Sequence, residues 1–407
     1  MPPIRLLTIP AQQIGTLLTE SWSAFRGTSR YTDVPPLDAS LRIVGEAVLD
    51  RTFTLFTNLM LGVPHPDSVR QMVEEGIEAR ALYEERGWLA DPASFHQTPP
   101  AVEESTWSDE ATWDGPRRRA FGHITFESGY EPHPGEPGRE RWLENRANRL
   151  VHAYVLEHPG APRPWLVCVH GFAMGTPMVN FSGFQVKRLH DELGLNLIFP
   201  CLPLHGPRSR GRFSGAEVLA PDYMNLVHLF AQGAWDIRRT LSWLRRRRAP
   251  RIGLYGVSLG GYTAALTAGL EEGLHCIFAS IPPVDFTNLA RDNEPWIMSR
   301  YYDDEVEMDW QLIRTITHVV SPLALPCRVP KGGRFIIAGV ADRVVRPYQP
   351  RALWRHWEEP AIHWFSGGHV AGQFKTTIAD FLDVSLRSAG MTPARPPDRG
   401  QAAAAGA

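Results

Sequence analysis

The stretch Ile252-Gly-Leu-Tyr-Gly-Val-Ser-Leu-Gly-Gly-Tyr-Thr-Ala-Ala-Leu266 decides the fold of this chain. It opens with a short apolar run, turns within a Gly-x-Ser-x-Gly pattern at Gly256–Gly260, and continues as a helix of small residues. A buried strand, a tight turn and a helix in this order expose the serine hydroxyl, and the positive end of the helix faces it. Ser258 is therefore the candidate nucleophile. The alternative is an ordinary glycine-rich turn between a strand and a helix.

Short apolar runs of the same kind recur on both sides of this stretch and indicate strands that are buried on both faces. The expected strands, besides the one at Ile252–Tyr255, are Ala120–Glu127, Leu150–Leu156, Trp165–Val169, Leu195–Phe199, His275–Ala279, Phe335–Ala338 and Ala361–Phe365. Helical patterns alternate with them at Phe184–Leu193, Asp222–Arg248, Gly260–Leu270, Pro350–Trp357 and Gln373–Leu386. The alternation predicts an α/β fold with a mostly parallel, eight-stranded sheet and helices on both of its faces.

The chain outside this sheet divides by composition. Residues 1–117 predict an N-terminal helical extension, with long helices at Leu41–Leu61 and Asp67–Arg86, and residues 118–388 predict the catalytic domain. Residues 285–327 are long for a loop, so we expect a short cap there. Residues 389–407 are rich in Pro, Ala and Gly and are expected to be disordered. The N-terminal helices would pack over the active-site side or form an interface, which suggests a homo-oligomer.

Composition excludes several classes of protein. The 407 residues include 42 basic and 44 acidic side chains, a net charge of −2, which argues against binding to nucleic acid. The basic run Arg245–Arg248 is better explained as the end of a helix, where cations complement the helix dipole. No apolar stretch is long enough to span a bilayer and no secretory signal is present, so a cytoplasmic protein is expected. Four cysteines without metal spacing, and 15 histidines without a His-Glu-x-x-His pattern, predict no metal and no cofactor.

The segment Val169-His-Gly-Phe-Ala-Met-Gly175 follows an early strand of the predicted sheet. A glycine beside the strand end lets the backbone approach a substrate closely. We therefore expect the backbone N–H groups of Phe172 and Leu259 to form an oxyanion hole. His170 either packs or orients this loop, and it also counts among the candidates for substrate binding.

A serine hydroxyl is a poor nucleophile at neutral pH, so it needs a base and an orienting carboxylate. The acid is expected between the serine and the histidine in chain order. Asp342 comes just past the strand Phe335–Ala338, at the sheet edge where open α/β sheets bind ligands. Asp285 is the alternative acid.

The candidate base is His369, in a glycine-rich loop past the strand Ala361–Phe365. It follows Asp342 in the chain, as the expected order requires. The alternatives are His205 and His363, of which the latter lies inside a predicted strand, where a histidine is usually a packing residue.

With these motifs, residues 118–388 resemble a serine hydrolase of the α/β-hydrolase superfamily. The resemblance is carried by His170-Gly-Phe172, Gly256–Gly260, Ala338-Gly-Val-Ala-Asp342 and Gly367-Gly-His369. It implies a triad in which Ser258 is the nucleophile, His369 the base and Asp342 its partner, working through an acyl-enzyme intermediate.

A second motif bears on the subgroup and the substrate. The loop Pro203-Leu-His-Gly-Pro-Arg208 resembles that of dienelactone-hydrolase-like and prolyl-oligopeptidase-like enzymes and of poorly characterised α/β-hydrolase-domain proteins. His205 and Arg208 in this loop would bind a substrate carboxylate or phosphate, or else Arg208 ties the loop down.

The expected cap contains the aromatic residues Phe286, Trp296, Tyr301, Tyr302 and Trp310. They have two possible roles: they line an apolar pocket for an acyl or alcohol group, or they pack the cap itself. The sequence thus predicts a cofactor-free hydrolase that cleaves a carboxylic ester or related acyl bond of a small molecule. A peptidase, thioesterase or acyltransferase on the same triad is the alternative, and a catalytically silent binding module is a further one.

Overall fold

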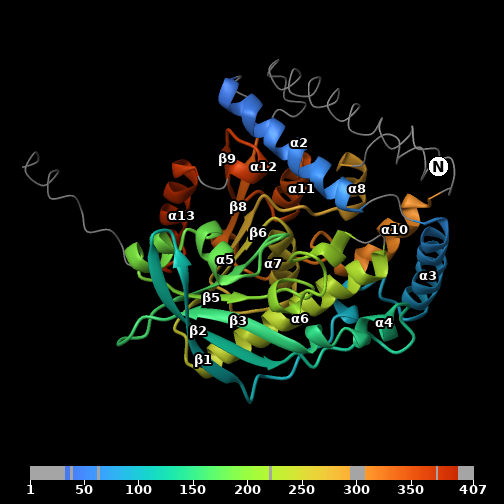
Figure 1. Ribbon diagram of the computed structural model, residues 1–407, viewed down its shortest axis with the longest axis horizontal. Helices are drawn as coiled ribbons and strands as arrows, with labels where there is room; N and C mark the ends of the chain where they lie inside the picture. The colour runs from blue at the N-terminus through green and yellow to red at the C-terminus, as the bar shows by residue number, and fades with distance from the viewer. Residues whose placement is uncertain are drawn as a thin grey trace, which may run out of the picture.

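The protein is described by a computed structural model, which covers residues 33–36, 40–61, 65–219, 222–293, 308–372 and 375–392. Its strands form a single sheet in the order β1-β2-β3-β5-β4-β6-β7-β8-β9 (Figure 1). Their bounds are β1 Thr106–Asp114, β2 Arg117–Glu127, β3 Leu150–Leu156, β4 Trp165–Val169, β5 Asn196–Pro200, β6 Ile252–Val257, β7 Cys276–Ser280, β8 Arg334–Gly339 and β9 Ala361–Phe365.

The sheet is antiparallel at its start and parallel from β5 onward. Strand β2 pairs antiparallel with β1 on one side and with β3 on the other, and β3 pairs antiparallel with β5. The strands β5, β4, β6, β7, β8 and β9 run parallel to their neighbours. The carboxyl ends of the parallel strands therefore meet at one edge, where an open α/β sheet binds its ligands. The structure confirms the α/β-hydrolase fold.

The sheet has nine strands among the described residues, so the expected number of eight was wrong by one. The additional strand is β1, which lies inside the segment expected to be helical. Most of its residues are exposed, so it lacks the apolar alternation by which a strand is recognised in a sequence. It pairs along its whole length with β2, to which it is joined by a turn at Gly115, where φ is +62°.

The helices and 3₁₀ turns cover the sheet and its ends. The α-helices are α2 Leu41–Leu61, α3 Pro66–Glu85, α4 Arg139–Glu144, α5 Pro177–Gly183, α6 Tyr223–Arg246, α7 Leu259–Leu270, α8 Phe286–Asn293, α10 Trp310–Thr317, α11 Tyr348–His356, α12 His369–Gly372 and α13 Thr376–Ser388. The 3₁₀ turns are η1 Pro92–Phe95, η2 Arg146–Arg149, η4 Gly206–Arg208, η5 Ala216–Leu219, η7 His318–Val320 and η8 Lys331–Gly333. The element η3 Lys187–Glu192 is a short π-helix.

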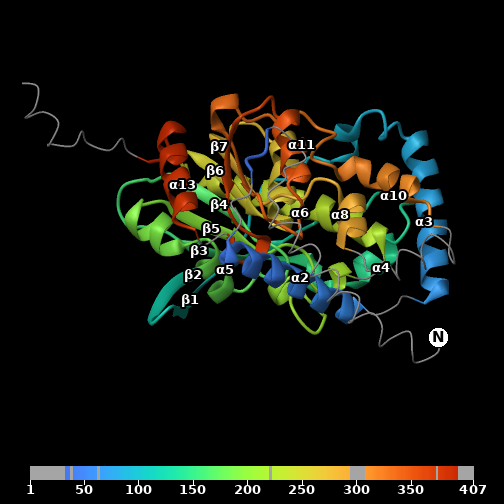
Figure 2. The ribbon, with the colours of Figure 1, turned by 90° about the horizontal axis from the view of Figure 1, so that it is seen from above.

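Two hydrophobic cores lie on the two faces of the sheet because side chains alternate along each strand. In β7, Ile277 and Ala279 belong to the larger core, which α6 and α7 cover together with the residues around α10 and α11. Their neighbours Cys276 and Phe278 belong to the second core, beneath the α5 region and α13. Figure 2 shows these two groups of helices on either side of the strands. Helices therefore pack on both faces, as expected.

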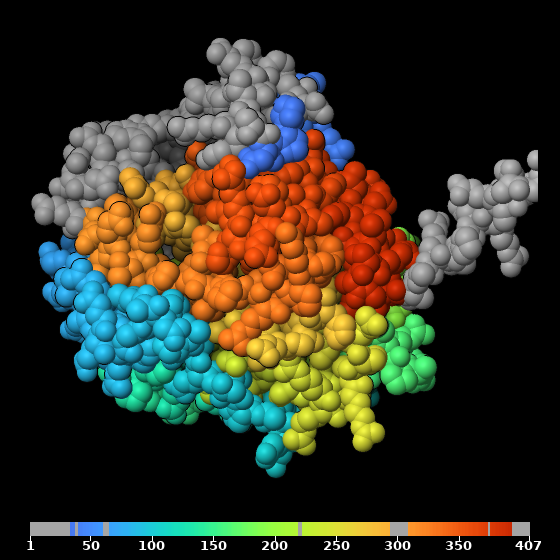
Figure 3. All heavy atoms as spheres, turned by 180° about the vertical axis from the view of Figure 1, so that it is seen from behind, coloured from blue at the N-terminus to red at the C-terminus, as the bar shows by residue number. Residues whose placement is uncertain are grey.

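The N-terminal helices lie on two different parts of the molecule. Helix α2 crosses the edge of the sheet where β8 and β9 end and contacts α12 (Figure 1). Helix α3 packs against α10 at a distant side, which Figure 3 shows as light blue atoms against orange ones. No helix within the described ranges is both long and apolar enough to cross a bilayer.

The expected cap is described in part, as α8 and α10. Phe286 of α8 packs on Phe230 and Tyr262, with ring centroids 4.9 Å apart in both pairs, so this aromatic residue contributes to the core. Residues Trp296, Tyr301 and Tyr302 lie outside the described residues, as does most of the tail from 389. The division into an extension, a catalytic domain and a tail stays a prediction.

Candidate active site

The turn between β6 and α7 holds Ser258 in a strained backbone conformation. Its φ is +53° and its ψ is −119°, a combination that residues with a side chain rarely adopt. The flanking glycines allow this turn because other backbone passes very close to them. A Cβ on Gly256 would lie 2.6 Å from the carbonyl carbon of Gly260, and a Cβ on Gly260 would lie 2.5 Å from the carbonyl oxygen of His170. The Gly-x-Ser-x-Gly pattern is thus required by packing.

A continuous chain of hydrogen bonds joins Ser258, His369 and Asp342. The Ser258 hydroxyl donates to His369 Nε2 at 3.0 Å, and His369 Nδ1–H donates to Asp342 Oδ2 at 2.7 Å. The second carboxylate oxygen of Asp342 accepts from the backbone N–H groups of Val344 and Val345, at 2.9 and 2.7 Å. These contacts hold the carboxylate and the imidazole in one orientation, with Nε2 free to accept the serine proton.

The environment of His369 makes it a stronger base than an ordinary histidine. Burial lowers its pKa, but the Asp342 charge, the hydrogen bond to Asp342 and the charge of Asp50 together raise the pKa above its usual 6.5. A base with this tuning accepts a proton readily near neutral pH.

The loop that follows β4 lies directly against the nucleophile. A Cβ on Gly171 would lie 3.1 Å from the carbonyl oxygen of Val257 and 3.4 Å from Ser258 Cβ, so a larger residue here would pack tightly against the turn that carries the nucleophile. Among the described residues, the N–H groups of Phe172 and Leu259 donate to no protein acceptor. Two free donors beside a nucleophile are what an oxyanion hole requires.

His170 and His205 are fully buried and hold neighbouring loops in place. His170 Nδ1–H donates to the Gly171 carbonyl, and its Nε2 accepts from the Leu202 N–H at 3.0 Å. His205 Nδ1–H donates to the Pro203 carbonyl at 2.9 Å. Burial lowers the pKa of His170 to about 3 and that of His205 to about 4. Both rings are therefore neutral, and neither has exposed surface in this structure. Their contacts are those of residues that hold the loops after β4 and β5.

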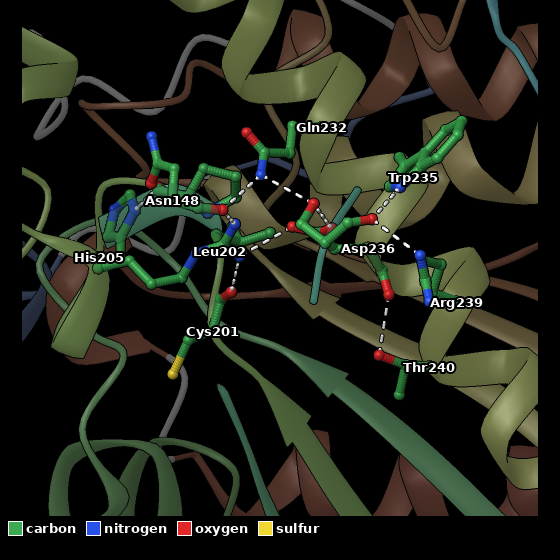
Figure 4. A network of polar contacts seen from close by, with 12 residues as sticks. Asn148, Cys201, Leu202, His205, Gln232, Trp235, Asp236, Arg239 and Thr240 are labelled. Atoms are coloured by element: carbon green, nitrogen blue, oxygen red, sulfur yellow. Dashed lines mark hydrogen bonds and ion pairs between the residues drawn. The ribbon is translucent and has the colours of Figure 1, made fainter. Parts of the chain in front are cut away.

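Arg208 is likewise buried and has protein partners. Its guanidinium forms an ion pair with Asp236 of α6 at 2.8 Å and donates to the carbonyl oxygens of Cys201 and Asn148. Figure 4 shows Asp236 and its neighbours on α6, with Asn148 and Cys201 opposite them. Of the two roles considered for Arg208, the structure supports the second: it ties the loop after β5 to α6, and it is not exposed to bind a substrate.

The alternative acid and base have other roles. Asp285 accepts from the backbone and side-chain amide of Asn288 at the start of α8, which makes it a helix cap. His363 lies within β9, where it hydrogen-bonds Thr377 and stacks on Phe381. Neither residue joins the chain of hydrogen bonds at Ser258.

The site also contains two acids that sequence reasoning missed. Asp50 and Glu46 of α2 accept hydrogen bonds from backbone N–H groups of the loops that carry Asp342 and His369. The one signal in the sequence was a pair of acids, four residues apart, in a helix that is apolar over much of its length. Among the described residues, no three His, Cys, Asp or Glu side chains are arranged to hold a metal ion.

Comparison with known proteins finds two full-length relatives. The uncharacterized protein MT2702 of Mycobacterium tuberculosis (strain CDC 1551 / Oshkosh) is 38% identical over 387 residues, which cover 95% of this chain and 91% of the relative. The uncharacterized protein Rv2627c of the H37Rv strain is 37% identical over the same shares of the two chains. No family model matches the chain.

Solved structures resemble this chain only distantly. An acetyl xylan esterase from Paenibacillus sp. R4 has 14% identity and a TM-score of 0.48, and the match covers 73% of this chain and 99% of the esterase. A puromycin-hydrolyzing peptidase of M. tuberculosis has 18% identity and a TM-score of 0.45, over 61% of this chain and 38% of the peptidase. These likenesses are too remote to carry a functional argument.

Proposed function

We propose that this chain, which belongs to the same family as the two mycobacterial proteins and has the α/β-hydrolase fold, is a serine hydrolase that cleaves a carboxylic ester. The observation that carries the proposal is the unbroken hydrogen-bond chain from Ser258 Oγ through His369 to Asp342. A strained serine beside a buried, carboxylate-oriented imidazole has the geometry of an activated nucleophile.

In the proposed reaction, the Ser258 oxygen attacks the acyl carbon while its proton moves to His369 Nε2. The carbonyl oxygen becomes an oxyanion, which accepts hydrogen bonds from the N–H groups of Phe172 and Leu259. The imidazolium then donates its proton to the departing alkoxide, so that an alcohol leaves and an acyl-enzyme remains. Water, deprotonated by the same imidazole, attacks this acyl-enzyme and releases a carboxylic acid, and the proton returns to Ser258. Asp342 keeps Nδ1 protonated throughout and stabilises the imidazolium.

The same groups would act on a thioester or an amide, and an amine or alcohol in place of water would make the enzyme an acyltransferase. Leaving groups of graded basicity, with one acyl chain in common, distinguish these activities. For an esterase we expect turnover of alkyl and aryl esters, no turnover of the matching anilide, and no transfer to added alcohol.

The decisive experiment uses a fluorophosphonate probe and a short p-nitrophenyl ester. We expect the wild-type protein to be labelled and to turn over the ester, and Ser258→Ala to lose both. Ser388→Ala is the control, because within the described ranges the Ser388 hydroxyl bonds only to a carbonyl of its own helix, that of Ser385. Labelling or turnover of Ser258→Ala at the wild-type rate would refute the proposal.

A further inference from the structure

Helix α2 extends a buried carboxylate, that of Asp50, between the loop that carries the acid and the loop that carries the base. Asp50 Oδ2 accepts from the N–H of Arg343 at 3.0 Å and from the N–H of His369 at 2.7 Å. Its Oδ1 accepts from the N–H of Val370 at 3.0 Å. One carboxylate thus binds the residue after Asp342 and the backbone of His369 itself, and it has no exposed surface.

Glu46, one helical turn earlier, reinforces the contact with the base loop. Its Oε2 accepts from the N–H of Gly368 at 3.0 Å, and its Oε1 accepts from Lys375 Nζ at 3.0 Å. Residues four apart lie on the same face of a helix, so α2 presents both acids to the same loop.

The two glycines before His369 are explained by these acids. A Cβ on Gly367 would lie 2.6 Å from Glu46 Oε2, and a Cβ on Gly368 would lie 2.7 Å from Asp50 Oδ2. Carboxylates can approach this stretch of backbone closely only because it carries no side chains. The loop is therefore shaped to receive α2.

Helix α2 also contacts the side of the site that would hold the oxyanion. The ring of Phe53 meets the ring of Phe172 edge-on, with centroids 6.2 Å apart. Phe172 in turn packs edge-on against Phe213, which meets Phe56 of α2. The helix therefore contacts all three loops that surround Ser258.

We propose that Asp50 is a positioning residue of the active site, which holds the acid and base loops in the register that His369 needs, and that α2 thereby completes the catalytic machinery. This inference rests on the proposed serine hydrolase function. A buried carboxylate that accepts several backbone hydrogen bonds fixes its donors strongly, because charge-assisted bonds are about twice as strong as neutral ones. An imidazole displaced by about 1 Å can lose roughly 10²-fold in rate.

The charges around Asp50 provide a readout that simple loss of packing would not change. Burial raises the pKa of Asp50 to about 6, and the Asp342 charge raises it too, whereas His369 and the backbone hydrogen bonds oppose the shift. The charged groups that act on it are Asp342 and His369 from the two loops. Glu46, on its own helix, is paired with Lys375. Above pH 6, ionised Asp50 raises the pKa of His369. Its removal should lower that pKa.

The test compares Asp50→Asn with Thr52→Ala in the full-length protein. Asparagine keeps the size of the side chain but loses the charge and turns an amide group toward an N–H donor. We expect kcat of Asp50→Asn to fall by about 10- to 100-fold with KM within about threefold. The acidic limb of the kcat/KM profile should move to lower pH. Thr52 lies on the exposed side of α2, and its hydroxyl donates to the carbonyl of Val48, its one hydrogen-bond partner among the described residues. Thr52→Ala should therefore behave as wild type.

A second variant covers the case in which Asp50→Asn fails to fold. Gly368→Ala keeps both acids but forces the loop away from Asp50, so it should lower kcat to a similar extent and leave the charge in place. If Asp50→Asn keeps the wild-type kcat and its acidic limb does not move, the inference about Asp50 is wrong. Fluorophosphonate labelling of the wild-type protein would in that case still support the proposed hydrolase. Unlabelled wild-type protein would instead refute the proposed function.

Discussion

The substitution Gly256→Ala tests whether the strained turn at Ser258 depends on the close approach of β6 and α7. The added methyl would collide with the Gly260 carbonyl oxygen, and it would lie 2.6 Å from the Gly260 carbonyl carbon and 2.8 Å from Ala264 Cβ. Ordinary van der Waals contact begins at 3.4 Å, so the strand and the helix must separate by at least about 0.8 Å near the serine. The carbonyl carbon and oxygen are backbone atoms, which cannot turn away as a side chain can.

We expect two effects of this separation. Overpacking of a core costs about 1–3 kcal/mol of unfolding free energy, and displacement of a nucleophile by nearly 1 Å lowers its reaction rate by roughly 10²-fold. The assay is the second-order rate of fluorophosphonate labelling, measured beside a urea unfolding curve so that only folded protein is compared.

Gly253→Ala is the matched control in the same strand. The three atoms nearest to its methyl would all belong to side chains, those of Cys276, Leu166 and Met391, which can shift without moving the turn. It should lose stability through overpacking but keep the labelling rate within about twofold, because the turn at Ser258 stays in place. Folded Gly256→Ala that is labelled as fast as wild type would refute this reasoning.

Three further predictions concern the base, its carboxylate and the buried ion pair. Because His369 must be neutral to accept a proton and its pKa is raised above 6.5, kcat/KM should fall tenfold per pH unit below an inflection above pH 6.5; a rate still constant below that pH would contradict the assignment. Asp342→Asn should lower kcat by about 10⁴-fold, since an amide no longer selects the Nδ1–H tautomer; steady-state kinetics measure this, and a loss under tenfold would argue against the role. Arg208→Met leaves Asp236 as an unpaired buried charge and should cost about 3–5 kcal/mol in urea unfolding. The exposed Arg210→Met should change stability by no more than about 0.5 kcal/mol, and equal losses in the two variants would contradict the buried pair.

Much of the fold is encoded in local patterns and could be predicted. Runs such as Trp165–Val169 and Phe335–Ala338 are apolar throughout because the parallel strands are covered on both faces. Strand β1 could not be predicted in this way, because it pairs on one side with β2 and exposes most of its residues to water. A strand without a buried face leaves no apolar pattern in its sequence.

The candidate site divides in the same manner. The residue types around Ser258 and the glycines of its turn are local features, and so is the glycine-rich loop before His369. The burial of His170, His205 and Arg208 is not local, since each is surrounded by residues from other elements. A sequence does not show whether an arginine is exposed or buried. The burial of Arg208 becomes evident in the structure, where its guanidinium pairs with Asp236.

The sequence by itself determined the order of strand, tight turn and helix around Ser258, because these elements depend on neighbouring residues and on hydrophobic periodicity. Only the tertiary structure brought Asp50 against a histidine more than 300 positions later in the chain. Backbone N–H groups are present at nearly every residue, so nothing in the sequence shows which of them a buried carboxylate will bind. That choice is made when α2 packs across the carboxyl ends of β8 and β9.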